Sequence, residues 1–86
     1  MIIKKFTVQN KLGIHARPAG LLVKTCSRYK SSVYIANEGN EVNAKSIMGV
    51  MSLGASQGSE ISIKAKGEDA QQAVAALAKL LDSLAD

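Results

Sequence analysis

The chain has 86 residues, of which 47% are hydrophobic and 21% charged, with a single cysteine and a formal net charge of +4. This size and composition predict one domain spanning residues 1–86 with a small core, and they exclude a disordered chain. No apolar run approaches the roughly 20 residues that a membrane-spanning helix needs, and a lone cysteine excludes an internal disulfide. We therefore expect a cytoplasmic protein that does not insert into a membrane.

The positive charge is concentrated in the first third of the chain. Residues 1–30 hold seven Lys or Arg residues and no acid, whereas residues 31–86 hold four Lys and seven acids, so their net charges are +7 and −3. This asymmetry indicates a negatively charged partner, which could be nucleic acid, an acidic protein surface or a phosphate. With only one Phe, two Tyr and no Trp, the chain has too few aromatic rings to stack nucleic acid bases, so we expect no nucleic acid partner.

The first predicted element is a strand at residues 2–8, in which Phe6 and Val8 point to one face. A helix is predicted at residues 16–28, because apolar residues recur at i, i+3, i+4 and i+7. Its buried stripe consists of Ala19, Leu22, Val23 and Cys26. The opposite side carries a basic stripe together with two other residues, in sequence order Arg17, Gly20, Leu21, Lys24 and Arg28.

The middle of the chain predicts a hairpin followed by a short helix. Strands at 32–36 and 41–43 flank the turn signal Asn-Glu-Gly-Asn at 37–40. A short helix is predicted at 46–53, with Ser46 as its N-cap and Gly54 ending it. Its pattern allows Ile47, Val50 and Met51 to face the core.

The last two predicted elements are a strand at 60–66, which points Ile61, Ile63 and Ala65 inward, and a helix at 70–84. The apolar stripe of this helix consists of Ala70, Ala73, Val74, Leu77, Leu81 and Leu84. Asp69 is its expected N-cap. The resulting order is β-α-β-β-α-β-α. We expect an α+β fold in which a four-stranded antiparallel sheet carries three helices packed on one face, an open-faced sandwich.

The segment Gly-Ile-His-Ala-Arg-Pro-Ala-Gly at 13–20 carries the clearest chemical signal. His15, the only histidine, directly precedes the first helix, where the N–H groups of the first turn favour an anion. Arg17 adds a cation suited to phosphate oxygens, and Pro18 fits the first helical turn. This combination favours a phosphoryl group held transiently on His15. The alternative is a surface histidine that happens to lie beside a helix start.

Other chemistries fit these residues less well. One histidine and one cysteine are too few for a structural zinc site, so we expect no metal and no cofactor. No carboxylate lies near His15 in the sequence to orient its ring, which disfavours a hydrolase triad.

The short helix at 46–53 offers more apolar surface than one face can bury. Met48 lies to one side of the core-facing positions, and an exposed Met patch often serves as an adaptable protein contact. The alternative is that all of these side chains belong to the core.

Together, the segments at 13–19 and 44–53 resemble the two signature segments of the HPr family, and their spacing and the chain length also agree. These are histidine-containing phosphocarrier proteins of the bacterial phosphotransferase system. The resemblance implies that His15 accepts a phosphoryl group on Nδ1 from enzyme I and donates it to enzyme IIA in phosphoenolpyruvate-dependent sugar uptake. Arg17 would steady the phosphoryl group. The protein would be a monomer and a carrier rather than an enzyme with its own turnover.

The resemblance gives Ser46 a second role, as the serine that an HPr kinase/phosphorylase phosphorylates in many relatives. A phosphate there should inhibit by repelling partners, because a helix N-terminus tolerates negative charge. We expect the partner-binding surface to comprise Gly20, Leu21, Lys24, Arg28, Ile47, Met48 and Met51. Two alternatives remain open: a nitrogen-branch relative, favoured by Asn-Lys-Leu-Gly at 10–13, and a purely regulatory protein in which phosphorylated Ser46 docks a transcriptional regulator.

Overall fold

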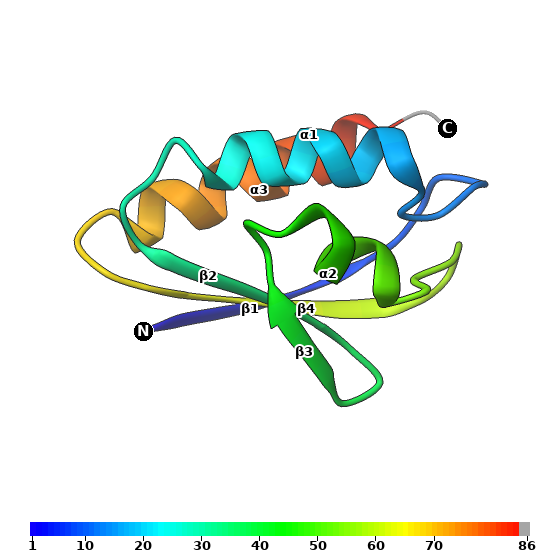
Figure 1. Ribbon diagram of the computed structural model, residues 1–86, viewed down its shortest axis with the longest axis horizontal. Coiled ribbons are helices and arrows are strands. Elements are labelled where there is room, and N and C mark those ends of the chain that lie inside the picture. Colours follow the sequence, from blue (N-terminus) through cyan, green and yellow to red (C-terminus); the bar gives the residue numbers. More distant parts are fainter. Residues whose placement is uncertain (85–86) are drawn as a thin grey trace.

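Figure 1 shows the computed structural model of the protein, which describes residues 1–84. Its elements, in chain order, are β1 (Ile2–Thr7), α1 (Ala16–Cys26), β2 (Ser32–Asn37), β3 (Asn40–Asn43), α2 (Ile47–Ser52), β4 (Glu60–Lys66) and α3 (Ala70–Ser83). The order and type of all seven elements confirm the sequence prediction, and the bounds differ by one or two residues at some ends.

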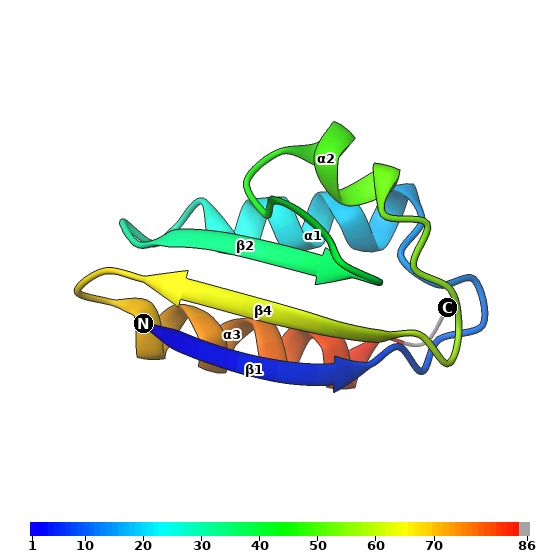
Figure 2. The ribbon, with the colours of Figure 1, turned by 90° about the horizontal axis from the view of Figure 1, so that it is seen from below.

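The four strands form one antiparallel sheet in the order β1-β4-β2-β3. β4 lies in the middle, where Ile61 is opposite Phe6 of β1 and Ile63 is opposite Ile35 of β2. Figure 2 shows the helices behind the sheet, all on one side, so the other face stays open. The predicted α+β open-faced sandwich is therefore confirmed.

The hairpin between β2 and β3 is tighter than the sequence predicted. Glu38 and Gly39 both have positive φ angles, +51° and +84°. Two central residues with φ above zero define a type I′ turn, whose twist matches that of the flanking strands. Because this turn needs only two residues, Asn37 and Asn40 belong to the strands, where they pair with each other.

The core lies between the sheet and the helices. In α3 the buried residues are the predicted Ala70, Ala73, Val74, Leu77 and Leu81, and in β4 they are Ile61, Ile63 and Ala65. In α1, the buried stripe contains Leu22 and Cys26, and α1 packs against both α2 and α3. No helix among residues 1–84 is long and apolar enough to cross a membrane.

Asp69 occupies the predicted N-cap position of α3, but its side chain makes no capping hydrogen bond. Its backbone (φ −104°, ψ 25°) lies outside the extended region that N-cap residues usually adopt. The carboxylate instead accepts hydrogen bonds from the Ser31 hydroxyl and from the amides of Lys30 and Ser31, both at 2.9 Å. The Ser31 hydroxyl bond and then the Lys30 amide bond are the main causes that lower the pKa of Asp69 to about 2. Asp69 thus ties the loop after α1 to the start of α3.

Candidate functional site

His15 is the N-cap residue of α1. Its backbone is extended (φ −86°, ψ −167°), and its carbonyl accepts the first helical hydrogen bond, from Ala19 N–H at 2.9 Å. Its imidazole makes no capping hydrogen bond to the helix and is partly exposed. The 11 residues of α1 align their peptide dipoles so that the positive end of the helix lies at His15. This environment favours negative charge beside the ring.

The loop that leads to His15 is held against the loop at 54–59. Gly13 has a φ of +68°, and a side-chain carbon there would lie 2.8 Å from Ser56 Cα and closer still to the Ala55 carbonyl oxygen. Only glycine fits this close approach without a shift of the backbone. Next to it, Ile14 N–H donates to the Ala55 carbonyl at 2.9 Å. Nothing in the sequence around Gly13 indicated that the 54–59 loop supports it.

The basic residues of the first third only partly share a helix face. Arg17 and Lys24 are exposed and seven residues apart on α1, which places them on the same side. Arg28 lies beyond the helix, because α1 ends at Cys26. The Ser27 hydroxyl bonds to the Val23 carbonyl at 2.8 Å, a local bond that competes with further helix. The expectation of a helix to residue 28 with a three-residue stripe was therefore wrong at its end.

Ser46 is the N-cap of α2, as predicted. Its Oγ accepts a hydrogen bond from Gly49 N–H at 3.2 Å, and its backbone is extended. The residue is exposed. An exposed hydroxyl at a helix start is accessible for modification, and the helix geometry does not depend on its proton, because Oγ acts there as the acceptor.

The remaining side chains of α2 largely face solvent. Ile47, Met48 and Met51 are 45%, 78% and 44% exposed, and we call these three the α2 apolar patch. The sequence pattern had allowed Ile47 and Met51 to face the core, but both are exposed, so they can belong to the partner-binding surface that was expected. Because α2 has only six residues and packs mainly against α1 and β3, one residue, Val50, is enough to fill its buried side. An exposed cluster of this type suits a protein contact.

Gly20 lies where α1 meets α2. A carbon added at Gly20 would lie 3.9 Å from Ile47 Cδ1, so α1 runs beside the α2 apolar patch. Leu21, the next residue along α1, is half-buried. Leu12, which was not among the predicted site residues, is 66% exposed three residues before His15. A leucine in a polar turn, with no apolar neighbour at helix or strand spacing, was the signal that could have found it.

Neither Cys26 nor a cluster of metal-ligating side chains provides a reactive site within residues 1–84. Cys26 is fully buried, and this burial raises the pKa of its thiol to about 11 despite the nearby positive charge of Lys45. Such a thiol is almost never ionised at neutral pH and makes a poor nucleophile. Within residues 1–84, no three side chains of the His, Cys, Asp or Glu type gather where they could hold a metal ion.

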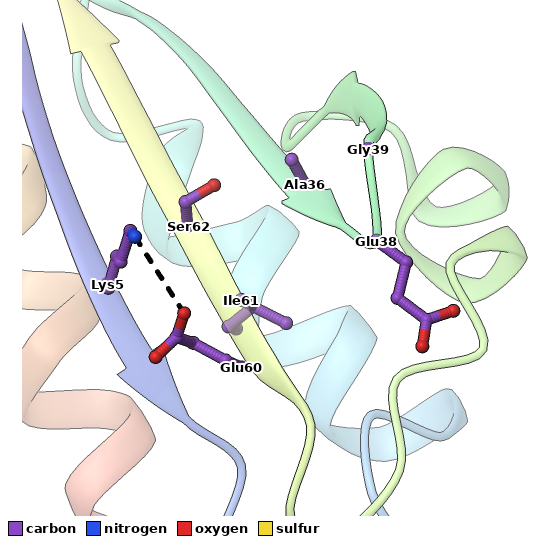
Figure 3. Close-up of a pocket in the computed structure, with 7 residues that line it drawn as sticks. All are labelled: Lys5, Ala36, Glu38, Gly39, Glu60, Ile61 and Ser62. Carbon is purple, nitrogen blue, oxygen red and sulfur yellow. Dashed lines mark ion pairs between the residues drawn. The ribbon is translucent and has the colours of Figure 1, made fainter.

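One hollow lies on the open face of the sheet (Figure 3). It has a volume of about 230 Å³ and contains the ion pair between Lys5 and Glu60, whose Nζ and Oε1 atoms are 3.9 Å apart. Neither His15 nor Ser46 lines it. The candidate chemistry therefore lies on the outer surface at the start of α1, a place that another protein can reach, rather than inside a cavity shaped for a small molecule.

Comparisons with known proteins match this arrangement. The family model described as "PTS HPr component phosphorylation site" matches residues 2–83. The chain belongs to the HPr family. Phosphocarrier protein HPr from Xylella fastidiosa strain Temecula1 is 48% identical over 83 residues, which cover 96% of this chain and 93% of that protein. The HPr-like protein Crh from Bacillus subtilis is 47% identical over 78 residues, 91% of this chain and 92% of Crh.

Solved HPr structures share the fold as well as the sequence. The crystal structure of HPr from Thermoanaerobacter tengcongensis superposes with a TM-score of 0.93 at 44% identity, covering 96% of this chain and 93% of that one. A dimer of HPr from the same organism superposes with a TM-score of 0.77 at 46% identity, covering 91% and 90%. Membership of the HPr family gives the protein a general role as a phosphocarrier of the phosphotransferase system. The dimeric relative leaves the expected monomer a prediction.

Proposed function

We propose that the protein carries a phosphoryl group on His15, which accepts it from enzyme I and donates it to enzyme IIA in phosphoenolpyruvate-dependent sugar uptake. The observation that supports this most is the position of the only histidine. It is the N-cap of an 11-residue helix, its ring does not cap that helix, and the exposed Arg17 follows in the first turn. A transferred phosphoryl group would meet the positive end of α1 and a guanidinium.

The proposed transfer needs little beyond positioning and charge. The unprotonated Nδ1 of His15 attacks phosphorus, one nitrogen–phosphorus bond forms, and the bond to the donor histidine breaks with its electron pair returning to that ring. In the second exchange His15 is the donor. A nitrogen of the acceptor attacks phosphorus, and the bond to Nδ1 breaks with its electron pair returning to the His15 ring. Because the bond formed resembles the bond broken, the protein acts mainly by orienting the ring and stabilising negative charge on the phosphoryl oxygens. We therefore describe it as a carrier rather than an enzyme with its own turnover.

We propose that both partners dock over the same surface beside His15. Its apolar part is the α2 apolar patch with Gly20 and Leu21, and its basic part is Arg17, Lys24 and Arg28. The positive charges would steer acidic partner surfaces toward His15, and the apolar side chains would supply the contact once they meet. One surface serving donor and acceptor in turn suits a carrier, because the two complexes then cannot form at once.

Ser46 is the proposed regulatory phosphorylation site, modified by an HPr kinase/phosphorylase. Its hydroxyl is exposed at the start of α2 and adjoins Ile47 and Met48 of the α2 apolar patch. A phosphate there adds a charge of about −2 at the edge of the docking surface, where it would repel acidic partners. The helix start itself tolerates the charge.

A second candidate is a mainly regulatory role, in which phosphorylated Ser46 docks a transcriptional regulator. The similarity to Crh, which is described as an HPr-like protein, favours this regulatory role as the second candidate. The nitrogen branch also stays a candidate pathway. In each case the expected location is the cytoplasm, and the proposed domain spans residues 1–86.

The test is phosphorylation by purified enzyme I with labelled phosphoenolpyruvate. The wild-type protein is expected to take up a label that acid releases and alkali does not, as a phosphorus–nitrogen bond does, while His15→Ala takes up none. An acid-stable label, or equal labelling of His15→Ala, would contradict the assignment. A parallel reaction with ATP and an HPr kinase, comparing wild type with Ser46→Ala, decides the regulatory role.

A further inference from the structure

We infer that Asn10 is a positioning residue for phosphoryl transfer, acting on His15 through the peptide unit between Gly13 and Ile14. The inference rests on the proposed function of His15. Asn10 is 4% exposed, while its neighbours Lys11 and Leu12 are exposed. A buried carboxamide is costly unless its hydrogen bonds are used.

The carboxamide closes the turn that leads to His15. Asn10 Nδ2 donates a hydrogen bond to the Gly13 carbonyl oxygen at 2.6 Å. In the other direction, Gly13 N–H donates to the Asn10 carbonyl at 3.1 Å. Residues 10–13 therefore form a β-turn that is closed once by the backbone and once by the side chain, with asparagine and glycine at the positions that favour them.

The side-chain bond of Asn10 reaches the peptide unit between Gly13 and Ile14, which lies just before His15. The Gly13 carbonyl and the Ile14 N–H belong to the same planar peptide group. Its oxygen accepts from Asn10 Nδ2, and its N–H donates to the Ala55 carbonyl at 2.9 Å. A rigid plane held at both ends has its orientation fixed.

His15 is consequently fixed from both sides along the chain. Upstream, the held peptide and the buried side chain of Ile14, which is 5% exposed, set where the backbone of His15 begins. Downstream, the His15 carbonyl accepts the first hydrogen bond of α1 from Ala19. The ring can then change direction only through its own side-chain torsions. Phosphoryl transfer depends on this alignment, since a displacement of about 1 Å can lower a transfer rate by on the order of 100-fold.

Other bonds would keep the loop in place if the Asn10 bond were lost. Gln57 Nε2 donates to the Gln9 carbonyl at 3.0 Å, and Val8 exchanges backbone hydrogen bonds with Gly58 and Ser59 at 2.8 and 2.9 Å. These bonds hold the path of the loop but do not touch the Gly13–Ile14 peptide. Loss of the Asn10 side chain should therefore reorient that peptide while the fold remains.

The test compares Asn10→Ala and Asn10→Asp with wild type, and uses Ser31→Ala as a matched control. Asn10→Asp keeps the shape but replaces the donor with an acceptor, so it serves even if Asn10→Ala fails to fold. Ser31→Ala removes a partly buried side-chain hydrogen bond to Asp69, and Figure 1 places the two ends of α1 at opposite sides of the molecule. For each protein we would measure hydrogen exchange at the Ile14 amide, and kcat and KM for phosphorylation by enzyme I.

The expected result is faster exchange at Ile14 in both Asn10 variants and a kcat lower by on the order of tenfold, with KM for enzyme I within about twofold of wild type. Ser31→Ala should leave both readouts unchanged. An unchanged kcat or Ile14 exchange rate in the Asn10 variants, or an equal loss in Ser31→Ala, would overturn the positioning role. A wild-type protein that takes no label contradicts the proposed function instead, and the positioning role falls with it.

Discussion

Gly20 lies in the interior of α1, close to His15, and no feature of its backbone requires glycine. It is absent from the residues with positive φ, and an added carbon would meet only Ile47 Cδ1, at 3.9 Å. That distance is an ordinary van der Waals contact. Gly20→Ala therefore adds a methyl group to a site that can accept it, at the junction of α1 with the α2 apolar patch.

The expected gain has two sources. Alanine is better than glycine in a helix interior by about 1 kcal/mol, chiefly because glycine loses more backbone entropy on folding. A half-buried methyl group adds about 0.4 kcal/mol, half the value for a fully buried one. The sum, about 1.4 kcal/mol in the free energy of unfolding, corresponds for a domain of this size to a rise in Tm of roughly 5–10 °C.

Thermal unfolding by circular dichroism, together with urea unfolding at constant slope, measures this change. The matched control is Gly49→Ala, a second glycine within a helix. A carbon at Gly49 would lie 3.3 Å from Val42 Cβ and 3.4 Å from Ser46 Cβ, so overpacking of about 1–3 kcal/mol should cancel or exceed its helix gain. If Gly20→Ala failed to raise Tm, the packing between α1 and α2 described above would be refuted. If Gly49→Ala raised it equally, the close contact of α2 with Val42 of β3 would be refuted.

Three further predictions concern charge. Because hydrogen bonds lower the pKa of Asp69 from 3.8 to about 2, its contribution to stability is present above pH 4 and is lost as the pH falls toward 2. The free energy of urea unfolding of Asp69→Asn should therefore depend less on pH than that of wild type over this range. Parallel curves for the two proteins would contradict this prediction. Ser46→Asp should keep the fold, since aspartate also caps helices, but slow phosphorylation by enzyme I, and a collapsed circular dichroism spectrum would contradict the proposed mechanism of inhibition. Lys24→Glu should raise KM for enzyme I at low salt, and its difference from wild type should shrink at high salt. Lys79→Glu on α3 should not raise KM. Equal effects of the two substitutions would argue against electrostatic steering by α1.

Local patterns were enough for most of the fold. The alternation at 60–66 predicted which face of β4 is buried, and the stripe of α3 gave its buried residues, because both depend on spacing within one element. The turn at 37–40 was predicted for the same reason, since its residues fit a tight turn wherever the strands lie.

Apart from the end of α1, which a local bond of Ser27 sets, the errors and omissions arise where a residue interacts far along the chain. Asp69 was expected to cap its own helix, but it bonds Lys30 and Ser31, which are 39 and 38 residues away in sequence. The exposure of Ile47 and Met51 depends on how little of α2 the rest of the molecule covers. The support of the His15 loop by Ala55 is also long-range. None of these contacts leaves a periodic signal in the sequence.

The candidate site divides in the same way. The sequence identified His15, Arg17 and Ser46 because each lies at a predicted helix start, and helix starts have local signals. The role inferred for Asn10 needed the structure, because a sequence does not show which peptide a buried carboxamide holds.

The central claim is that His15 both accepts a phosphoryl group and passes it on. The most direct measurement is a pulse–chase: label the protein with enzyme I and phosphoenolpyruvate, remove both, and add a purified enzyme IIA. The account predicts that label leaves the wild-type protein and appears on enzyme IIA, and that His15→Ala never acquires it. Label that stays on the wild-type protein in the presence of active enzyme IIA, or that reaches enzyme IIA equally through His15→Ala, would contradict the account.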